Sequence, residues 1–361
     1  MDARYDIAVV GAGMAGASLA AAIGARARVL VIEAEERPGY HTTGRSAAFW
    51  SESYGGPDVQ PLTTASGQAL RDLGMLGPRR ALTMGRVGQE AQVEAFIERY
   101  RGAGLEVEWV DRAGIEGYVP GLKPGWSCGA FEPSCCDIDV AGLHQHYLAE
   151  ARRAGTDLWC HAGLAGAERT AQGWTLTLSD GRRVSCAILA DAAGAWADPV
   201  ARMAGVRPIA ITPYRRTIAQ LAVSPVVPDD LPLVLDIAES FYFKPESGRL
   251  WLSPHDETPS APCDAAPEEL DVALAIDRFE QVVDWRIERL EHRWAGLRSF
   301  APDRLPVYGF APLEPAFFWF AGQGGFGIQT APAAAGLAAR LLLGEAGGDI
   351  DPEPYSPKRF S

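Results

Sequence analysis

The sequence predicts an α/β fold in two parts: a parallel sheet, and an α+β second domain built on a mainly antiparallel sheet. Three observations support this. A strand, a glycine-rich turn, a helix and a second strand follow one another before residue 33. Another apolar strand and an alanine-rich helix lie near the end of the chain, at 317–321 and 330–343. After Pro208, short strand-like runs separated by prolines indicate the antiparallel sheet. The 361 residues, 47% of them hydrophobic, favour two domains over one core.

The first 32 residues predict a β-α-β unit of the Rossmann type. Residues 5–10 form an apolar run short enough for a buried strand, and an alanine-rich helix extends to about residue 25. A second apolar run, at 28–32, follows the helix. Two strands joined by a helix in this way belong to a parallel sheet.

The turn between the first strand and the helix has the spacing G-x-G-x-x-G, at Gly11, Gly13 and Gly16. Gly11 permits the tight turn, Gly13 lets the backbone approach a pyrophosphate, and Gly16 lets helix and strand pack closely. The helix N-terminus supplies free N–H groups for phosphate. Glu33 ends the second strand, where a carboxylate can accept hydrogen bonds from ribose hydroxyls. The unit therefore predicts a dinucleotide site, for which NAD and FAD are equal candidates on this motif alone.

The remaining elements follow along the chain. A loop rich in Gly, Ser, Thr and Tyr spans 35–61 and is typical of a functional segment. The proline-rich tail at 349–361 is expected on the surface. Periodicity and turn signals predict helices at 64–73, 90–102, 140–154 and 270–290, and strands at 106–110, 173–178, 182–185, 186–192, 216–223, 240–244 and 250–253.

The charge composition argues against a nucleic-acid partner. Lys and Arg number 33 and Asp and Glu number 46, so the formal net charge is −13. Nucleic acid and anionic lipid repel so acidic a protein, and we expect it to be soluble and cytoplasmic. The uncharged run 7–25 has the length of a membrane span or a targeting segment, but its glycine pattern argues against both, so no integral membrane segment is expected.

The cysteines and histidines predict neither a disulfide scaffold nor a metal site. The six cysteines contain no C-x-x-C pair and are expected as reduced thiols. His144 and His146 lie two residues apart on a predicted helix, which places them on different faces. Nothing near the adjacent Cys135 and Cys136 in the sequence lowers a thiol pKa, which argues against a redox pair or a covalent cofactor link.

Six further segments carry a resemblance to a known family. They are GYHTTGRSAA at 39–48, DIDVAGLH at 137–144, AAGAWAD at 192–198, ESFYFKP at 239–245, WAGLRSF at 294–300 and GGFGIQT at 324–330. With the glycine turn, they resemble the D-amino-acid oxidase/glycine oxidase superfamily of flavoproteins, and within it the bacterial FAD-dependent D-arginine dehydrogenases. The similarity spans nearly the whole chain and implies non-covalent FAD rather than NAD.

The resemblance implies a division of the chain and a set of cofactor contacts. The FAD-binding domain comprises 1–80, 137–207 and 300–361, and the substrate-binding domain comprises 81–136 and 208–299. In the expected contact set, Arg45 and Ser46 can cap phosphate charge, and the small Ala47 and Ala48 let the backbone pass near a flat ring. The full set is Gly11, Gly13, Ala15, Gly16, Glu33, Ala34, Thr43, Gly44, Arg45, Ser46, Ala47, Ala48, Leu164, Ala193, Gly194, Trp196, Gly324, Gly325, Phe326, Gly327, Ile328, Gln329 and Thr330.

The resemblance also implies a substrate site for a small carboxylate. Arg298 corresponds to the residue that clamps the substrate carboxylate, because a guanidinium fork matches a carboxylate with two charge-assisted hydrogen bonds. Tyr242 corresponds to its hydroxyl partner and Tyr54 to a lid or wall residue, while Arg216 is a weaker candidate for the same pocket. The carbonyl of Gly325 resembles the acceptor for the substrate amine. The alternatives are a surface or ion-pair role for Arg298 and a core role for Tyr54 or Tyr242.

The expected side-chain pocket departs from that of the arginine-specific enzymes. Phe49 occupies the place of a histidine, and Ala81 lies near the place of an acidic residue. An uncompensated guanidinium in an apolar pocket is unfavourable by several kcal/mol, so D-arginine and D-lysine are expected to be poor substrates. The pocket is instead expected to be apolar and formed by Phe49, Trp50, Leu233 and Leu235.

The expected reaction is oxidation of a D-amino acid with a neutral or apolar side chain to the imino acid and then the 2-oxo acid. Hydride leaves Cα for the flavin, and no side chain need act as a strong base. Oxygen, a quinone or an electron carrier remains open as the electron acceptor. Two alternatives remain: oxidation of a 2-hydroxy acid or an N-substituted glycine, and a non-catalytic flavin-binding or biosynthetic tailoring protein.

Overall fold

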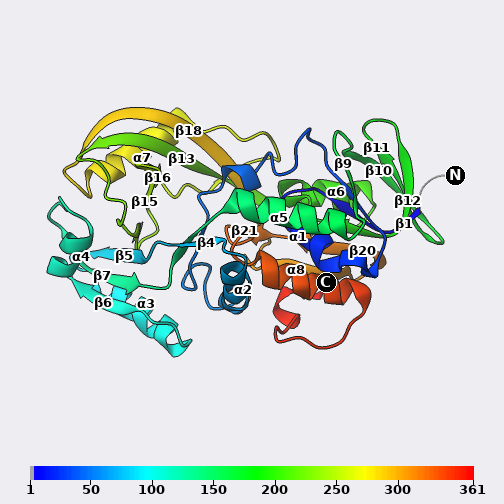
Figure 1. Ribbon diagram of the computed structural model, residues 1–361, viewed down its shortest axis with the longest axis horizontal. Coiled ribbons are helices and arrows are strands. Elements are labelled where there is room, and N and C mark those ends of the chain that lie inside the picture. Colours follow the sequence, from blue (N-terminus) through cyan, green and yellow to red (C-terminus); the bar gives the residue numbers. More distant parts are fainter. Residues whose placement is uncertain (1–3) are drawn as a thin grey trace.

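A mainly parallel sheet organises one end of the molecule (Figure 1), and the computed structural model describes residues 4–361. Its strand order is β10-β11-β12-β1-β2-β9, with β20 beside β12 and β19 beside β20. The pairs β1·β2, β1·β12, β2·β9 and β12·β20 are parallel, as predicted for the N-terminal unit. The strands span Arg4–Val10 (β1), Val29–Ile32 (β2), Asp157–Trp159 (β9), Leu164–Thr170 (β10), Gly173–Leu178 (β11), Arg183–Asp191 (β12), Val307–Ala311 (β19) and Glu314–Ala321 (β20).

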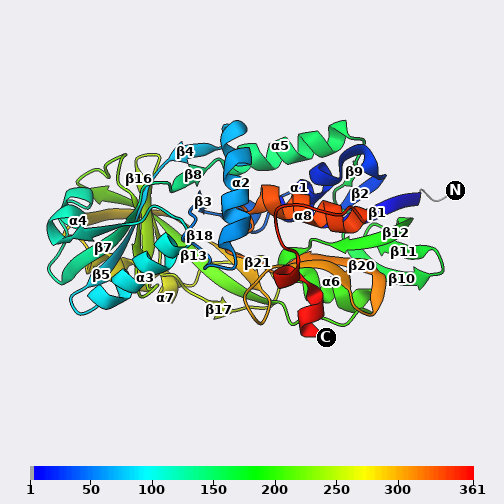
Figure 2. The same ribbon diagram turned by 90° about the horizontal axis from the view of Figure 1, so that it is seen from below.

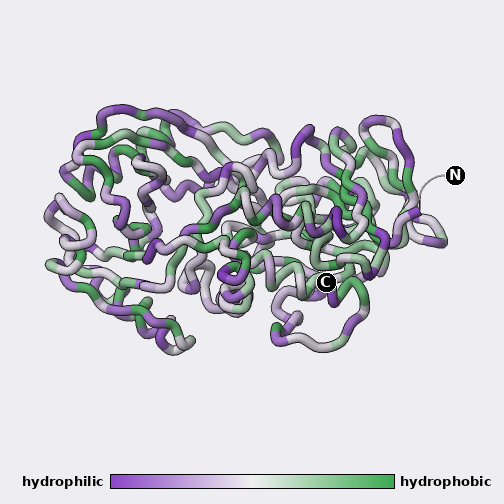
Figure 3. The backbone as a smooth tube through the Cα atoms, viewed as in Figure 1, coloured by the Kyte–Doolittle hydropathy of each residue, from purple (hydrophilic) through white to green (hydrophobic). Residues whose placement is uncertain are grey.

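This sheet is buried on both faces, which explains its uninterrupted apolar strands. Along β1, Ile7 and Val9 belong to one apolar core, and Ala8 and Val10 belong to another. Helices α1 (Met14–Ile23) and α8 (Ala331–Leu343) pack together on the first of these cores. Helix α5 (Val140–Arg153) packs along α1. In Figure 3 the strands of this part are largely hydrophobic, and much of the hydrophilic chain lies in peripheral loops.

The second sheet lies at the other end of the elongated molecule (Figure 1). Its order is β21-β18-β13-β16-β15-β14-β5-β7-β6, with β17 beside β13. All its pairs are antiparallel except β5·β14, which is parallel, so the predicted antiparallel sheet is mixed. The strands span Ala81–Arg86 (β5), Glu108–Asp111 (β6), Trp126–Glu132 (β7), Thr212–Ser224 (β13), Leu233–Asp236 (β14), Tyr242–Glu246 (β15), Arg249–Ser253 (β16), Thr258–Pro259 (β17), Arg286–Phe300 (β18) and Gln323–Gly324 (β21).

One predicted helix is wrong over its second half. The helix expected at 270–290 ends early, as α7 (Glu269–Glu280), and residues 286–290 begin the long strand β18. Arg, Glu and Leu in this segment are good helix formers, which explains the error. The segment is a strand because β18 pairs with β13 along nearly its whole length, from Arg286 to Phe300.

Smaller elements lie between the two large sheets or pack against one of them. A three-stranded sheet joins β3 (Phe49–Trp50), β8 (Cys136–Ile138) and β4 (Leu76–Pro78). Figure 2 shows helix α2 (Gln60–Asp72) crossing the molecule between the two large sheets. Helices α3 (Glu90–Gly102) and α4 (Arg112–Tyr118) pack on β7, and α6 (Ala197–Met203) lies against the first sheet. The division into two domains at the expected boundaries stays a prediction.

Candidate active site

One cavity of about 400 Å³ extends from the N-terminal glycine turn to the second sheet. At one end its wall contains Gly11, Gly13 and Glu33. At the other end it contains Arg216 from β13 and Arg298 from β18. Groups predicted to hold a dinucleotide and groups predicted to hold a substrate therefore face the same space.

The glycine turn is held in place by side chains from three other segments. The Glu33 carboxylate accepts hydrogen bonds from the backbone N–H of Ala12 at 2.8 Å and of Glu35 at 3.0 Å. Thr43 accepts one from the N–H of Met14 at 2.9 Å, at the first residue of α1. The Nε2 of His144 lies 2.9 Å from the Ala12 carbonyl, and burial lowers the pKa of this imidazole. The neutral ring then donates to that carbonyl, so His144 has a structural partner here.

The three glycines of the turn meet different surroundings. Gly11 has a φ of +97°, which L side chains rarely adopt. A Cβ on Gly16 would lie closer than 3.0 Å to the Gly11 carbonyl oxygen, so this glycine allows helix and strand to pack. A Cβ on Gly13 would meet only the Thr43 hydroxyl, at 3.2 Å. Gly13 therefore leaves the backbone open toward the cavity.

Most of the other predicted cofactor residues also line the cavity. These are Ala15, Ala34, Thr43, Arg45, Ser46, Ala47, Ala48, Leu164, Ala193, Gly194, Trp196, Gly324, Gly325, Gly327, Ile328 and Gln329. Four lie behind its wall: Gly16, Gly44, Phe326 and Thr330. The Phe326 ring packs on Phe300 and Tyr54, and the buried Thr330 hydroxyl donates to the Phe326 carbonyl. Direct contacts of all these residues with a cofactor stay predictions.

The side chains of Arg45 and His41, both in the cavity wall, have different hydrogen-bond partners. The Arg45 guanidinium pairs with Asp264 and donates to the carbonyls of Ala265 and Ala295, so its predicted phosphate contact stays a prediction. His41 Nε2 lies 2.9 Å from a Glu35 oxygen, and its ring lies 4.6 Å from that of Trp196. The other ring nitrogen, Nδ1, is buried and lacks a partner among residues 4–361. It is a polar atom available to a ligand in the cavity.

The predicted substrate residues converge at the opposite end. Arg298 donates from Nη2 to the Tyr54 hydroxyl at 2.6 Å. A Cβ on Gly325 would collide with the same guanidinium, so the absence of a side chain allows the two to lie together. The Arg216 guanidinium lies 6.0 Å from the centre of the Tyr242 ring. Two guanidinium groups and two tyrosines thus surround one volume and can bind a carboxylate there.

The electrostatics of this end are set by burial. Burial raises the pKa of Tyr242, so its hydroxyl stays protonated and can donate. Burial also lowers the pKa of Arg216, and the positive charge of Arg298 adds to that effect. His255 lies behind Tyr242, and burial with the charges of both arginines lowers its pKa to about 3. A neutral His255 adds no positive charge to the carboxylate site.

The segment that carries Tyr54 is tied to both halves of the molecule. The side chain of Gln329 donates to the Tyr54 carbonyl at 3.1 Å and accepts from the Ser51 N–H at 3.2 Å. The buried Glu132, at the end of β7, accepts from the Glu52 N–H at 2.9 Å and from the hydroxyls of Ser51 and Ser53. Burial raises the pKa of Glu132. This carboxyl therefore anchors the Tyr54 segment to the second sheet.

We expect Glu132 to make stability depend on pH. Because its pKa is raised in the folded protein, its contribution to the free energy of unfolding is complete below the unfolded-state pKa, near 4.5, and is lost as pH rises through the folded-state value. Urea unfolding of the wild type and Glu132→Gln should show this between about pH 5 and about pH 8, with a change of up to about 1.4 kcal/mol per pH unit. Glu98→Gln, on the exposed face of α3, is the control. Identical pH profiles for the wild type and Glu132→Gln would contradict the expectation.

An apolar region adjoins the arginines. Phe49 and Ile218 line the cavity, and Ala47 and Tyr242 pack with them. Leu233 and Leu235, also predicted for this pocket, do not line the cavity. Leu233 belongs to the same apolar cluster, and Leu235, Trp251 and Trp294 pack against that cluster. The prediction for Trp50 is wrong, because its ring is buried in another core and donates to the Thr63 carbonyl at 2.9 Å. Adjacent residues of a strand point to opposite faces, so Phe49 and Trp50 diverge.

Two residues at this end of the cavity, Ile218 and Glu257, are not among those predicted from the sequence. Ile218 follows Arg216 by two positions on β13, so strand periodicity alone would have placed both on one face. Glu257 carries no local signal, yet its carboxylate contacts both cavity arginines. These contacts depend on the pairing of strands that lie far apart in the sequence.

Other features concern metals, membranes and thiols. Within residues 4–361, no cluster of three His, Cys, Asp or Glu side chains could hold a metal ion. The helices of the same range include none with the length and apolar character needed to cross a lipid bilayer. Burial raises the pKa values of Cys135 and Cys136, so both remain thiols rather than thiolates.

The chain is similar to proteins of known families. The sequence model of the DAO family, described as FAD dependent oxidoreductase, matches residues 6–341. Hydrogen cyanide synthase subunit HcnC from Pseudomonas aeruginosa is 26% identical over 258 residues, 71% of this chain and 60% of that protein. Glycine oxidase from the same organism is 29% identical over 254 residues, 66% of this chain and 64% of the enzyme. The chain thus matches somewhat under two thirds of these relatives' lengths.

A solved structure extends the likeness to the whole fold. Glycine oxidase from Geobacillus kaustophilus superposes with a TM-score of 0.87 at 22% identity, and the match covers 99% of each chain. The predicted fold class, an α/β cofactor-binding part with a second sheet domain, is therefore confirmed. At this identity the likeness concerns the fold.

Proposed function

The chain belongs to the DAO family of FAD dependent oxidoreductases, whose cofactor is FAD, and from this premise we propose that it oxidises a D-amino acid with a neutral or apolar side chain. The amino acid loses a hydride from Cα and a proton from nitrogen to give the imino acid. Water then converts the imino acid to the 2-oxo acid and ammonia. The observation that carries the proposal is the convergence of Arg216, Arg298, Tyr54 and Tyr242 on the cavity that also contains the glycine turn.

The cavity fits FAD. Gly13 exposes backbone at the start of α1, where a pyrophosphate would lie, and Glu33 lies at the end of β2, where a ribose would lie. His41, which lines the same cavity, adds a buried Nδ1 that has no partner among residues 4–361. When bound, the flavin supplies the hydride acceptor.

The residues of the chain bind and orient the substrate. Arg298 and Arg216 hold its carboxylate, and the Tyr242 hydroxyl, which burial keeps protonated, donates to it. Tyr54, bonded to Arg298, closes the cavity over the substrate. The carbonyl of Gly325, beside the same guanidinium, accepts a hydrogen bond from the amine. Fixing the carboxylate and the amine together determines which substituent of Cα faces the hydride acceptor.

The side chain of the substrate occupies the apolar region at Phe49 and Ile218. Neither Ala81 nor Phe49 offers a counter-charge to a cationic side chain. Leaving such a charge unpaired is unfavourable by several kcal/mol. The D configuration is supported by the resemblance of the sequence motifs.

We expect a kcat/KM for D-leucine or D-phenylalanine at least about 100-fold above that for D-arginine, equivalent to about 2.7 kcal/mol of lost binding. Steady-state kinetics and anaerobic bleaching of the bound flavin over a panel of D- and L-amino acids measure this. The panel includes 2-hydroxy acids and N-substituted glycines of matched size. A preference for D-arginine would overturn the apolar pocket, and bleaching by a 2-hydroxy acid alone would overturn the amine substrate.

A further inference from the structure

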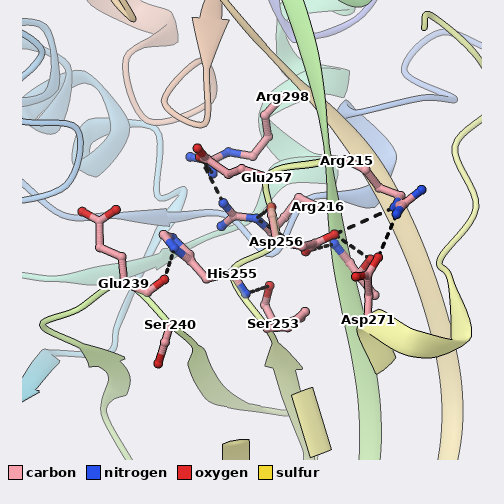
Figure 4. Close-up of polar contacts among 12 residues, drawn as sticks. Arg215, Arg216, Glu239, Ser240, Ser253, His255, Asp256, Glu257, Asp271 and Arg298 are labelled. Atoms are coloured by element: carbon pink, nitrogen blue, oxygen red, sulfur yellow. Dashed lines mark hydrogen bonds and ion pairs between the residues drawn. The ribbon is translucent and has the colours of Figure 1, made fainter. Parts of the chain in front are cut away.

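A carboxylate that takes no part in the proposed reaction lies behind the two cavity arginines (Figure 4). One oxygen of Glu257 accepts from Arg298 Nη1 at 3.2 Å and from Arg216 Nη2 at 3.4 Å. The same oxygen accepts from Arg304 Nη2 at 2.9 Å. Glu257 itself does not form part of the cavity wall. It therefore contacts the arginines on the side away from the substrate volume.

The position of Glu257 is built into the sheet. The residue follows Asp256, which accepts from the backbone N–H of Thr217 at 2.7 Å and from its hydroxyl at 2.9 Å. It precedes β17, whose Thr258 pairs with Arg215 on β13. The backbone is thus fixed on both sides of Glu257. Its carboxylate meets Arg216 because this loop runs beside β13.

A neighbouring carboxylate stabilises the two cavity arginines. Arg216 is 6% exposed and Arg298 is 9% exposed, and two buried like charges that face one volume repel each other. Glu257 engages one nitrogen of each guanidinium, Nη2 of Arg216 and Nη1 of Arg298. Arg216 Nε donates to the Asp256 carbonyl and Arg298 Nη2 donates to the Tyr54 hydroxyl. Arg216 Nη1 and Arg298 Nε therefore remain to form one shared site, the size of a single carboxylate.

We propose that Glu257 is a specificity-determining residue, a carboxylate on the solvent-exposed side of the arginine pair that holds Arg216 and Arg298 for one substrate carboxylate and disfavours substrates that carry a second one. The inference rests on the proposed function, because it requires the two arginines to bind the substrate carboxylate. The negative charge of Glu257 repels each anionic group in the cavity, so a dianion is repelled more strongly than a monoanion of the same length.

The experiment compares butyrate and succinate, which have the same number of carbons and differ by one carboxylate. Each acid is titrated into the FAD-loaded wild type and Glu257→Gln. The dissociation constant is read from the flavin absorbance and, independently, from the ligand-induced shift in Tm. The wild type should prefer butyrate, and in Glu257→Gln the affinity ratio of succinate to butyrate should rise about tenfold.

Two further variants separate specificity from structure. Glu257→Asp keeps the charge and should keep a ratio near that of the wild type, whatever happens to the absolute affinities. Glu268→Gln removes a negative charge from an exposed partner of Arg215, outside the cavity, and should change the ratio less than about twofold. The same rise in both Gln variants, or an unchanged ratio in Glu257→Gln, would overturn the inference alone. If the wild type binds neither acid, the carboxylate site of the proposed function is wrong, and the inference fails with it.

Discussion

Replacing Arg298 by methionine is expected to lower kcat/KM for the preferred amino acid by about 30-fold to about 4000-fold, the equivalent of about 2–5 kcal/mol. The guanidinium is 9% exposed and donates to the Tyr54 hydroxyl at 2.6 Å and to Glu257 at 3.2 Å. Methionine fills similar volume but cannot donate a hydrogen bond. The substrate carboxylate would lose its partner beside a buried guanidinium, which is the costly case, and Tyr54 and Glu257 would each lose a hydrogen bond.

The measurement is the rate of flavin reduction by the amino acid, together with the affinity for butyrate. Both should fall in Arg298→Met, whereas the FAD content should stay that of the wild type, because the substituted group lies at the far end of the cavity from the glycine turn. Arg293→Met is the matched control on the same strand, since Arg293 is exposed and pairs only with Glu269 at 3.6 Å among the residues described. A kcat/KM within about threefold of the wild type in Arg298→Met would show that this arginine is not the clamp.

The second large effect is expected at the glycine turn, where two Gly→Ala variants should fail in different ways. Gly16→Ala puts a methyl group against the Gly11 carbonyl, and backbone cannot move aside as a flexible side chain does. We expect the free energy of unfolding to fall by about 3 kcal/mol or more. Gly13→Ala meets only the Thr43 hydroxyl at 3.2 Å, and its backbone conformation suits any L residue. Its apoprotein should unfold within about 0.5 kcal/mol of the wild type.

FAD affinity separates the two variants. In Gly13→Ala, the new methyl group occupies the space through which the backbone approaches the pyrophosphate, so the dissociation constant should rise at least about tenfold, or about 1.4 kcal/mol. Urea unfolding of the apoproteins and titration with FAD, followed by flavin fluorescence, measure stability and affinity independently. Wild-type FAD affinity in Gly13→Ala would refute the predicted role of this residue. A stable Gly16→Ala apoprotein would refute the packing argument.

The local sequence pattern correctly predicted the β-α-β unit that forms the cofactor end of the cavity. The strand, turn, helix and second strand before residue 33 all form, and the first sheet is parallel there. Each of these signals lies within a few residues of the element that it specifies. Glu33 is a further case, since its place at the end of β2 follows from strand length alone.

The same kind of reasoning failed where distant pairing competes with local preference. Residues 286–290 favour a helix by composition, but four of them pair with β13 as part of the long β13·β18 ladder, which makes them a strand. Trp50 is predicted in the substrate pocket together with Phe49, but the pleat of β3 turns its side chain into another core. Both errors arise because the contacts that decide the structure lie outside the segment itself.

The β-α-β unit, the glycine turn and the type of residue at each end of the cavity could be predicted from the chain alone, because they depend on backbone freedom and on periodicity over short distances. That Tyr54, Arg216, Tyr242 and Arg298 share one volume became clear from the folded protein, since four segments separated by many residues must pair before these side chains meet. The folded protein also shows that Glu257 bridges the two arginines. An ion pair between side chains depends on distances of a few ångströms, and the register of β13 with β17 and β18 sets these distances.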